Sequence, residues 1–358
     1  MRLALFASAV LRTAAFLGLV VDHVRPVIAL KSATIHLASA HGHWRFHSCT
    51  PDWTGNQEAR MTATHPTATP VALDRKPRDE EIDIYGLTHP GKVRTENQDH
   101  FLICALKKQM LVHQTSLPQT DNLIGEPERL AFLAMVADGV GGGAKGADAS
   151  RIALEAVTRY VSHSMKIYYA LGSGSDREFH EALQQGAHQS HAELLRRGEE
   201  NPEYRGMATT LTLYFGVWPR AYLLQVGDSR CYVLRRGELI QISRDQTMAQ
   251  ELVDLGVLTR AAAAVTRLAH TLSSSIGGRK TAPVVSRIDM TWGNVLLLCS
   301  DGVTKHVSDE RIRERLRSMT SAKQAAEDLL HDALEGGGSD NITVIVGRAL
   351  PSSANPMA

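Results

Sequence analysis

Four short acidic segments adjoin apolar runs of strand length, and this pattern constrains the fold more than any other feature of the chain. The segments are Arg94–Asp99, Asp138–Gly142, Ser300–Gly302 and Ser339–Asn341. Strand ends are places where a sheet can direct side chains from distant parts of the sequence to one point. Carboxylates that meet there need a cation to hold them together, and oxygen ligands favour Mg²⁺ or Mn²⁺. The sequence therefore predicts a sheet-based fold with a metal site where these strands end.

Apolar runs and helical spacing predict the elements around these segments. We expect strands at residues 85–87, 101–106, 131–137, 209–215, 221–226, 230–234, 295–299 and 342–346. We expect helices at residues 149–161, 177–195 and 321–334, the last with a capping box from Ser321 to Gln324. The run Ala131–Ala137 is apolar throughout, which indicates a strand buried on both faces. Successive strands mixed with helix pairs favour an α+β fold with a two-layered sheet core and helices outside it.

The charge balance and the cysteines limit the classes of partner and site. Lys and Arg number 39 and Asp and Glu number 38 among 358 residues, so no basic excess is available to neutralise nucleic-acid phosphates. The four cysteines lie far apart and form no Cys-x-x-Cys pair, which argues against a zinc site of that kind. Cys104 and Cys299 lie in apolar runs, as expected of buried thiols in a reducing compartment. We therefore expect a cytoplasmic protein.

The N-terminal part is expected to lie outside the folded domain. The expected organisation is an extension at 1–80, a domain at 81–350 and a flexible tail at 351–358. Leu3–Val21 is mostly apolar, but Arg12 interrupts it, and a central Arg costs about 2.5–3.5 kcal/mol in a membrane-spanning helix. Ala38–Ala40 resembles a signal-peptide cleavage site but lies far from the apolar stretch. We favour a disordered extension, or a true start at Met61, over secretion.

Asp138 is the candidate bridging ligand of the metal site. It ends an apolar run and precedes Gly139, whose missing side chain leaves its carbonyl free to turn into a tight site. One carboxylate can bridge two cations; Asp301 and Asp340 could complete the ligands of one, and Asp99 could serve the other directly or through water. Carboxylates about 5 Å apart repel by roughly 3 kcal/mol per pair at an effective dielectric near 20, and a divalent cation reverses that sign.

Such a centre predicts chemistry on a phosphate. Two metal ions about 3.5–4 Å apart would lower the pKa of a shared water and present hydroxide for in-line attack on phosphorus. Arg94 could hold the phosphate oxygens, because its planar guanidinium matches them two at a time. Taken singly, each Asp-Gly or Asp-Asn is usually a turn, and a lone Arg is usually a surface charge. Four acidic strand ends spread over one domain are difficult to attribute to turns alone.

The ordered set of motifs resembles that of the PPM, or type 2C, metal-dependent serine/threonine protein phosphatases in their bacterial form. The resemblance runs from about Asp83 to Arg348. Its motifs are Gly91-Lys-Val-Arg94-x-x-Asn97-Gln98-Asp99, Asp138-Gly-Val-Gly-Gly142, Gly206-Met-Ala-Thr-Thr210, Gly227-Asp228-Ser229-Arg230, Ser300-Asp301-Gly302 and Asp340-Asn341-Ile342-Thr343. It implies a four-layer α-β-β-α sandwich with two central, mostly antiparallel sheets flanked by helices. It also implies hydrolysis of phosphoserine and phosphothreonine by a metal-bound hydroxide, with two Mn²⁺ or Mg²⁺ ions.

The resemblance also assigns roles to individual residues. Asp138 would bridge both metals, Gly139 (through its carbonyl) and Asp99 would serve one, Asp301 and Asp340 would serve the other, and Arg94 would bind the substrate phosphate. Asp228 looks like the residue that helps hold a third, weaker metal ion, although a turn aspartate between strands is an equally good interpretation. Thr209 and Thr210 are expected to bond within the sheet. The implied partners are phosphorylated proteins that a serine/threonine kinase produces, and we expect a monomer without nucleic-acid or membrane binding.

Three departures from the family pattern concern substrate contacts. Val140 stands where some relatives have a His proposed as general acid, so leaving-group protonation would fall to a metal-bound water. Gln246 follows Asp245 where many relatives carry His. The segment Ser243–Gly278 corresponds to the family's variable flap beside the site, and its Thr271–Gly278 part is atypical.

Other functions fit the sequence less well. Gly141-x-Gly143-x-x-Gly146 formally matches a dinucleotide fingerprint, but the acidic residue expected about 20 residues later is missing near Lys166. Lys145 is followed by Gly146, so there is no P-loop. No cysteine begins a Cys-x5-Arg loop, so a thiol-nucleophile phosphatase is not supported. A catalytically silent phosphatase fold that binds phosphoproteins is the alternative from a different class, although every metal carboxylate is retained.

Overall fold

The computed structural model describes residues 75–109, 114, 128–141, 144–170, 175–289 and 291–351. The expectations for residues 1–74, including the start at Met61, and for the tail at 352–358 lie outside the described residues. None of the described helices is both long enough and apolar enough to cross a membrane.

Two antiparallel sheets form the centre of the described domain. The first has the strand order β1 (Ile82–His89), β11 (Ile342–Ala349), β10 (Val295–Cys299), β7 (Arg230–Arg235) and β8 (Glu238–Gln241). The second has the order β2 (Asp99–Lys108), β3 (Glu128–Val140), β5 (Leu211–Val217), β6 (Arg220–Val226) and β9 (Val284–Asp289), and β4 (Ala208–Thr209) pairs with the end of β3. The described pairings are all antiparallel, whereas a dinucleotide-binding fold needs a mostly parallel sheet.

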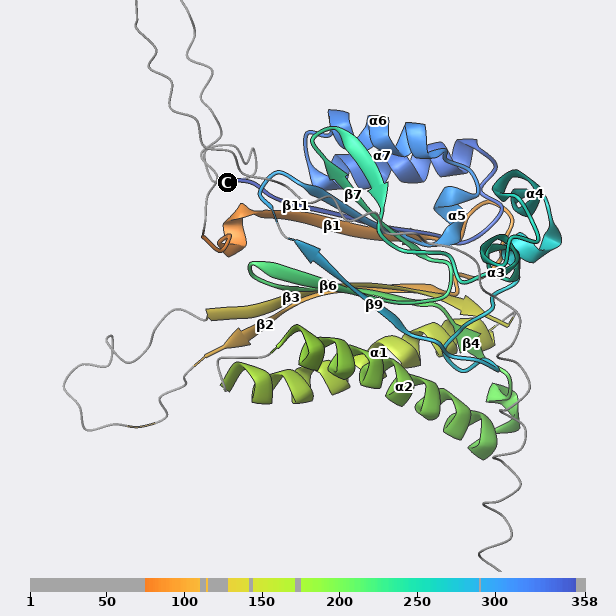
Figure 1. The fold of residues 1–358 in the computed structure, drawn as a ribbon, viewed down its shortest axis with the longest axis horizontal. Coiled ribbons are helices and arrows are strands. Elements are labelled where there is room, and N and C mark those ends of the chain that lie inside the picture. The colour runs from red at the N-terminus through yellow and green to blue at the C-terminus, as the bar shows by residue number, and fades with distance from the viewer. Residues whose placement is uncertain are drawn as a thin grey trace, which may run out of the picture. The chain divides into compact units, whose positions relative to one another are not determined.

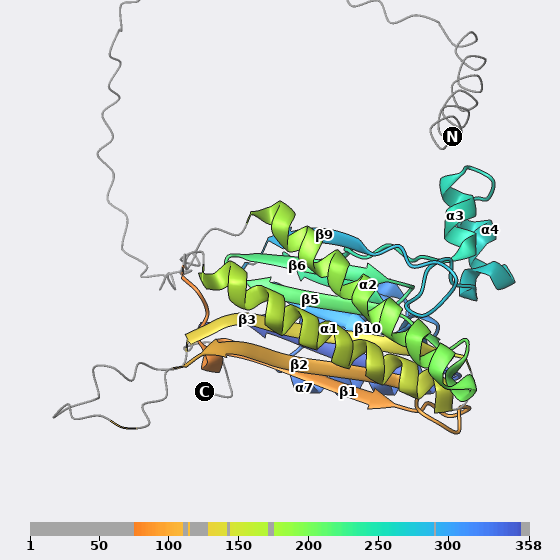
Figure 2. The same cartoon turned by 90° about the horizontal axis from the view of Figure 1, so that it is seen from below.

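Helices cover the outer face of each sheet (Figure 1). The long helices α1 (Ala144–Ala170) and α2 (Asp176–Glu200) lie side by side on the second sheet, as Figure 2 shows from below. The helices α5 (Asp301–Thr304), α6 (Asp309–Ser318) and α7 (Ala322–Glu335) lie on the first sheet. The expected α+β class and the α-β-β-α order of layers are therefore confirmed.

Short elements join these layers. They are the 3-10 helices η1 (Asp79–Glu81), η2 (Pro202–Tyr204) and η3 (Arg267–His270), and the helices α3 (Met248–Asp254) and α4 (Arg260–Ala264). The last two and η3 belong to the segment 243–278 that was expected to form a flap.

Three apolar clusters separate the four layers, and strand β3 contributes to two of them. Leu133 and Met135 pack with α1 and α2, whereas Ala134 and Val136 lie between the two sheets. A third cluster joins the first sheet to α5, α6 and α7. Successive side chains of a strand point to opposite faces, so a strand with both faces covered must be apolar at every position. This explains the continuous apolar run in β3 that was evident in the sequence.

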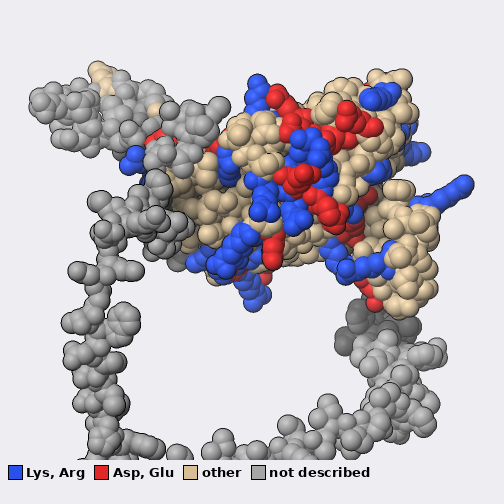
Figure 3. Space-filling view, turned by 90° about the horizontal axis from the view of Figure 1, so that it is seen from above, with Lys and Arg blue, Asp and Glu red and all other residues tan. Residues whose placement is uncertain are grey.

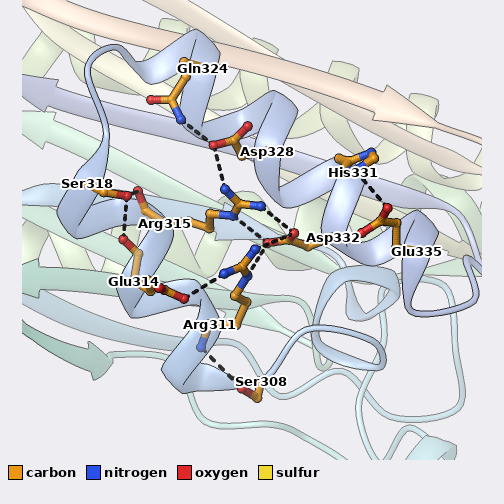
Figure 4. A network of polar contacts seen from close by, with 10 residues as sticks. All are labelled: Ser308, Arg311, Glu314, Arg315, Ser318, Gln324, Asp328, His331, Asp332 and Glu335. Carbon is orange, nitrogen blue, oxygen red and sulfur yellow. Dashed lines mark hydrogen bonds and ion pairs between the residues drawn. The ribbon is translucent and has the colours of Figure 1, made fainter.

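Helix α7 begins where the capping box was expected. Ser321 is its N-cap, and the Oγ atom of Ser321 accepts a hydrogen bond from the Gln324 N–H at 3.1 Å. The face above α6 and α7 shows basic and acidic side chains interspersed (Figure 3). Asp332 of α7 accepts hydrogen bonds from both Arg311 and Arg315 of α6 (Figure 4). Arg315 and then Arg311 lower the pKa of Asp332 to about 2, although burial opposes them.

All the strands and helices expected from the sequence are present in the described residues. The sequence analysis missed β8, β9 and the short helices α3 to α6. Strand β9 is an edge strand of its sheet and has no fully buried residue, so it lacks the apolar run that marks an inner strand. Helices of four to ten residues carry too few turns for a clear apolar period.

Candidate metal centre

The predicted acidic strand ends lie at one end of the two sheets. Asp99 begins β2 and is the direct cross-strand partner of Asp138 near the end of β3. Asp301 is the first residue of α5, two residues after β10, and Asp340 lies two residues before β11. Because β10 and β11 are antiparallel neighbours, the end of one adjoins the start of the other.

Asp99 and Asp138 lie close to Asp301 and Asp340, as a hydrogen bond and the effects of their charges on one another show. The Oγ1 atom of Thr343, on β11, donates to Asp99 Oδ2 at 2.7 Å and so links the two sheets. Burial, followed by the negative charges of Asp99, Asp301, Asp228 and Asp340, raises the pKa of Asp138 well above its ordinary value. The structure thus brings together the five aspartates that the sequence analysis singled out.

Two carboxylate oxygens of this group, Asp99 Oδ1 and Asp301 Oδ1, are buried without a hydrogen-bond partner. Burial raises the pKa of Asp99 to about 6, although hydrogen bonds from Ser300 and Thr343 oppose the shift. A buried anionic oxygen without a donor is energetically costly. Divalent cations would satisfy these atoms, and the all-oxygen donor set fits hard ions such as Mn²⁺ or Mg²⁺.

Two basic side chains also contact these carboxylates. Lys305 Nζ lies 2.6 Å from Asp301 Oδ2 and 2.7 Å from Asp340 Oδ2. Arg94 Nε lies 2.8 Å from Asp340 Oδ1. Burial acts to raise the pKa of Asp340, but Lys305 and Arg94 lower it overall. In the described part of the chain, no three His, Cys, Asp or Glu side chains are arranged so that they could hold an ion; the Lys305 ammonium contacts both Asp301 and Asp340 instead.

The backbone of Asp138 is held by neighbouring residues, and its carboxylate is not needed for that purpose. Its N–H donates to Thr210 Oγ1 at 2.9 Å, and its carbonyl accepts from Thr209 Oγ1 and from the Thr210 N–H, both at 2.8 Å. The two threonines therefore bond within the sheet, as expected. A Cβ atom on Gly139 would lie 2.1 Å from the carbonyl oxygen of Gly146, so the close approach of α1 requires a glycine here.

Asn341 anchors the loop that carries Arg94, a role that the sequence analysis missed. The Oδ1 atom of Asn341 accepts a hydrogen bond from the Gln98 N–H at 2.9 Å. Its Nδ2 atom donates to the carbonyls of Pro90 at 3.0 Å and Glu96 at 2.9 Å. Three hydrogen bonds from one amide thus fix the loop next to Asp340. The sequence around Asn341 does not reveal these partners, which lie some 250 positions earlier in the chain.

Asp228 lies in the turn between β6 and β7, and its negative charge also raises the pKa of Asp138. It is buried, and this burial, together with the charges of Asp301 and Asp245, raises its pKa to about 7. Asp245 in turn pairs with Arg230 at 2.7 Å. The placement of Asp228 is compatible with both interpretations from the sequence, a turn aspartate and a ligand of a third ion.

Gln246, a departure from the family pattern, holds the start of the segment 243–278. Its Oε1 atom accepts a hydrogen bond from the Gly227 N–H at 2.8 Å, and its Nε2 atom donates to the Ala282 carbonyl at 2.9 Å. The amide of Gln246 supplies both an oxygen that accepts the first hydrogen bond and a nitrogen that donates the second. This departure therefore has a structural role at the start of the segment.

We expect the metal-free protein to lose stability as the pH rises through the window between 3.8 and about 7. The pKa values of Asp99 (about 6) and Asp228 (about 7) lie above the ordinary 3.8, so the folded state binds more protons than the unfolded state in this window. Each pKa unit corresponds to about 1.4 kcal/mol, so the two raised carboxyl groups together correspond to a loss of several kcal/mol. Urea unfolding in EDTA at a series of pH values measures the change.

The matched control for this prediction is Asp228→Asn, which removes one raised carboxylate and keeps every histidine. The histidines matter because burial lowers the pKa of His100 and His191, and this produces the opposite pH trend. The variant should lose less stability than the wild type over the same window. Equal slopes for the two proteins would contradict the prediction.

Comparison with known proteins identifies similar sequences. A sequence model described as protein phosphatase 2C matches residues 113–335, which is more than half of the chain. The serine/threonine protein phosphatase PstP of Mycobacterium tuberculosis is 34% identical over 216 residues, which cover 60% of this chain and 40% of PstP. The serine/threonine phosphatase stp of Listeria monocytogenes is 29% identical over 215 residues, which cover 60% of this chain and 83% of that protein. The match thus spans only about two fifths of the length of PstP.

Solved structures show the same fold. The crystal structure of the M. tuberculosis phosphatase PstP/Ppp has a TM-score of 0.60 and 28% sequence identity, and the match covers 75% of this chain and 99% of that one. The PstP catalytic domain in complex with two manganese ions has a TM-score of 0.57 and 29% identity, with the same coverage of both chains.

Proposed function

The chain belongs to the protein phosphatase 2C family, and we propose that it is a metal-dependent phosphatase of phosphoserine and phosphothreonine in proteins. One observation carries the proposal. Asp99, Asp138, Asp301 and Asp340 converge at one end of the sheets, and two of their oxygens are buried without a partner. The manganese ions in the PstP structure support the same interpretation of this group.

The donor atoms suggest how two ions would be held. Asp138 would bind both ions, the carbonyl of Gly139 and Asp99 would complete the ligands of one, and Asp301 and Asp340 would complete those of the other. When bound, Mn²⁺ or Mg²⁺ would supply an activated water and positive charge against the phosphate. Asp228 is the candidate for a third ion, because it is buried and its charge acts on Asp138.

The residues of the chain itself would bind and orient the substrate. Arg94 is more than half exposed, and its planar guanidinium can bind two phosphate oxygens. The hydrogen bonds of Asn341 hold the Arg94 loop in place, so little further ordering is needed on binding. Val140, after Gly139, cannot donate a proton, so the proton for the leaving serine or threonine oxygen must come from water.

The described cysteines are unsuited to act as nucleophiles. Burial raises the pKa of the thiols of Cys104, Cys231 and Cys299, in the last case to about 12. A thiolate is the reactive form, and these three stay protonated at neutral pH. Direct attack by water, without a covalent phosphoenzyme, is therefore the reaction that this part of the chain supports.

Hydrolysis of a phosphothreonine peptide by the full chain tests the proposal. We expect phosphate release in the presence of Mn²⁺, its loss on addition of EDTA and no effect of a thiol-alkylating reagent. The peptide should carry a sequence that a serine/threonine kinase phosphorylates, since the products of such kinases are the proposed substrates. Binding of Mn²⁺ and of the phosphopeptide without phosphate release would instead favour the silent phosphoprotein-binding module.

A further inference from the structure

Lys305 places a positive charge among the carboxylates that the proposed function assigns to the ions. It lies on the turn after Asp301, four residues along, and its ammonium contacts both Asp301 and Asp340. The side chain is 22% exposed, and both carboxylates are about 20% exposed. A lysine ammonium is ordinarily charged at neutral pH, so the two contacts are ion pairs.

Two carboxylate oxygens of the group contact the Lys305 ammonium, whereas others have no partner. Asp301 Oδ2 and Asp340 Oδ2 both lie within 2.7 Å of the ammonium. Asp99 Oδ1 is buried and has no hydrogen-bond partner. An ion that binds Asp301 and Asp340 through these Oδ2 atoms must displace the lysine or share the oxygens with it, whereas Asp301 Oδ1 has no partner. Among the described residues, no lysine or arginine forms an ion pair with Asp99 or Asp138, so an ion at these two residues meets no such competitor.

We propose that Lys305 is a built-in counter-cation that competes with a divalent ion for Asp301 and Asp340. The ion at these two aspartates is then bound more weakly than the ion at Asp99, Asp138 and the Gly139 carbonyl. In the metal-free protein the ammonium offsets the repulsion between the two carboxylates. This inference rests on the proposed function, because it assumes that the aspartates hold metal ions.

Titration of the metal-free full chain with Mn²⁺ by calorimetry tests the inference. For the wild type we expect two classes of site with different Kd values. Lys305→Met keeps the length of the side chain and removes its charge, so the weaker site should tighten by at least about tenfold, which corresponds to about 1.4 kcal/mol. Lys305→Arg keeps the charge and should bind Mn²⁺ much as the wild type does.

Lys323→Met is the matched control. Lys323 also pairs with an acid four residues away, Glu327 at 3.8 Å, but it is exposed on α7 and contacts no aspartate of the group. Its removal should leave both Mn²⁺ affinities unchanged. Comparison of Lys305→Met with Lys323→Met shows whether a change in Mn²⁺ affinity depends on the position of the lost charge or only on the loss of one lysine.

Thermal unfolding gives a second readout that does not depend on activity. Without metal, Lys305→Met should unfold at a lower temperature than the wild type, because Asp301 and Asp340 then lose the ammonium that pairs with both of them. Saturation with Mn²⁺ should raise its Tm by more than it raises the Tm of the wild type. If the metal-free variant does not fold, its Mn²⁺ affinity is measured by removing the ion from the loaded protein with a chelator of known affinity.

The outcomes separate the inference from the proposed function. Unchanged or weaker Mn²⁺ binding in Lys305→Met, with normal binding in the wild type, overturns the inference and leaves the metal centre intact. Failure of the wild type and both Lys305 variants to bind Mn²⁺ overturns the metal centre itself, and the inference falls with it.

Discussion

Replacement of Asp138 by Asn is expected to lower kcat/KM for a phosphothreonine peptide by at least about 10³-fold, equivalent to about 4 kcal/mol of transition-state stabilisation. The pKa of Asp138 is raised by the negative charges of Asp99, Asp301, Asp228 and Asp340. Asp138 therefore occupies the centre of the group. An amide of the same shape cannot provide an anionic bridge between two ions. Steady-state kinetics at saturating Mn²⁺ measure the loss.

The fold of Asp138→Asn should remain intact. Its backbone contacts to Thr209 and Thr210 do not involve the carboxylate. Removal of a buried charge that its neighbours repel should leave the metal-free variant at least as stable as the wild type. The variant should also gain less stability from Mn²⁺, which thermal unfolding measures. Turnover within tenfold of the wild type would contradict the assignment of Asp138.

A second Asp→Asn substitution serves as the control. Asp332 lies on α7, where it binds Arg311 and Arg315 in the network of Figure 4. Asp332→Asn removes the anion that the two arginines share and should cost about 2 kcal/mol of stability, although Arg311 keeps Glu314 and Arg315 keeps Asp328. Its activity should match that of the wild type at temperatures where it is folded. The two variants therefore separate loss of chemistry from loss of stability.

The layers of the fold could be predicted because their causes are local. A strand covered on both faces is apolar at every position, as Ala131–Ala137 is, and helix α7 carries its own capping residue in Ser321. Edge strand β9 and the short flap helices could not be predicted. Their residues are partly exposed, so local apolar periodicity does not mark them.

The acidic residues of the candidate site could be predicted from the sequence, but the contacts that hold them in place could not. Asp-Gly after an apolar run and Asp-Asn before one mark strand ends, so the convergence of Asp138, Asp301 and Asp340 could be anticipated. The contact of Lys305 with Asp301 follows helical spacing, but its contact with Asp340 depends on how β10 and β11 pair. The partners of Asn341 likewise depend on tertiary structure. Contacts between distant segments leave no local pattern in one sequence.

Replacement of Arg94 by Ala is expected to raise KM for a phosphothreonine peptide by about 10–100-fold, because each charge-assisted hydrogen bond to a phosphate contributes about 1.5–3 kcal/mol. The effect on kcat should be smaller, since Arg94 is assigned to phosphate binding. The KM of Arg94→Lys should lie between those of the wild type and Arg94→Ala, because an ammonium keeps the charge but lacks the planar arrangement of donors in a guanidinium. Initial rates over a range of peptide concentrations at saturating Mn²⁺ measure both constants.

The contact of Arg94 with Asp340 offers a competing explanation, in which Arg94 only positions a metal ligand. The two roles differ in what they change. If Arg94 binds phosphate, Arg94→Ala raises KM while the Kd for Mn²⁺ stays within about threefold of the wild type. If it only holds Asp340, the Mn²⁺ affinity changes and KM at saturating Mn²⁺ does not. An unchanged KM would therefore remove Arg94 from the substrate site and leave it as a neighbour of the metal ligands.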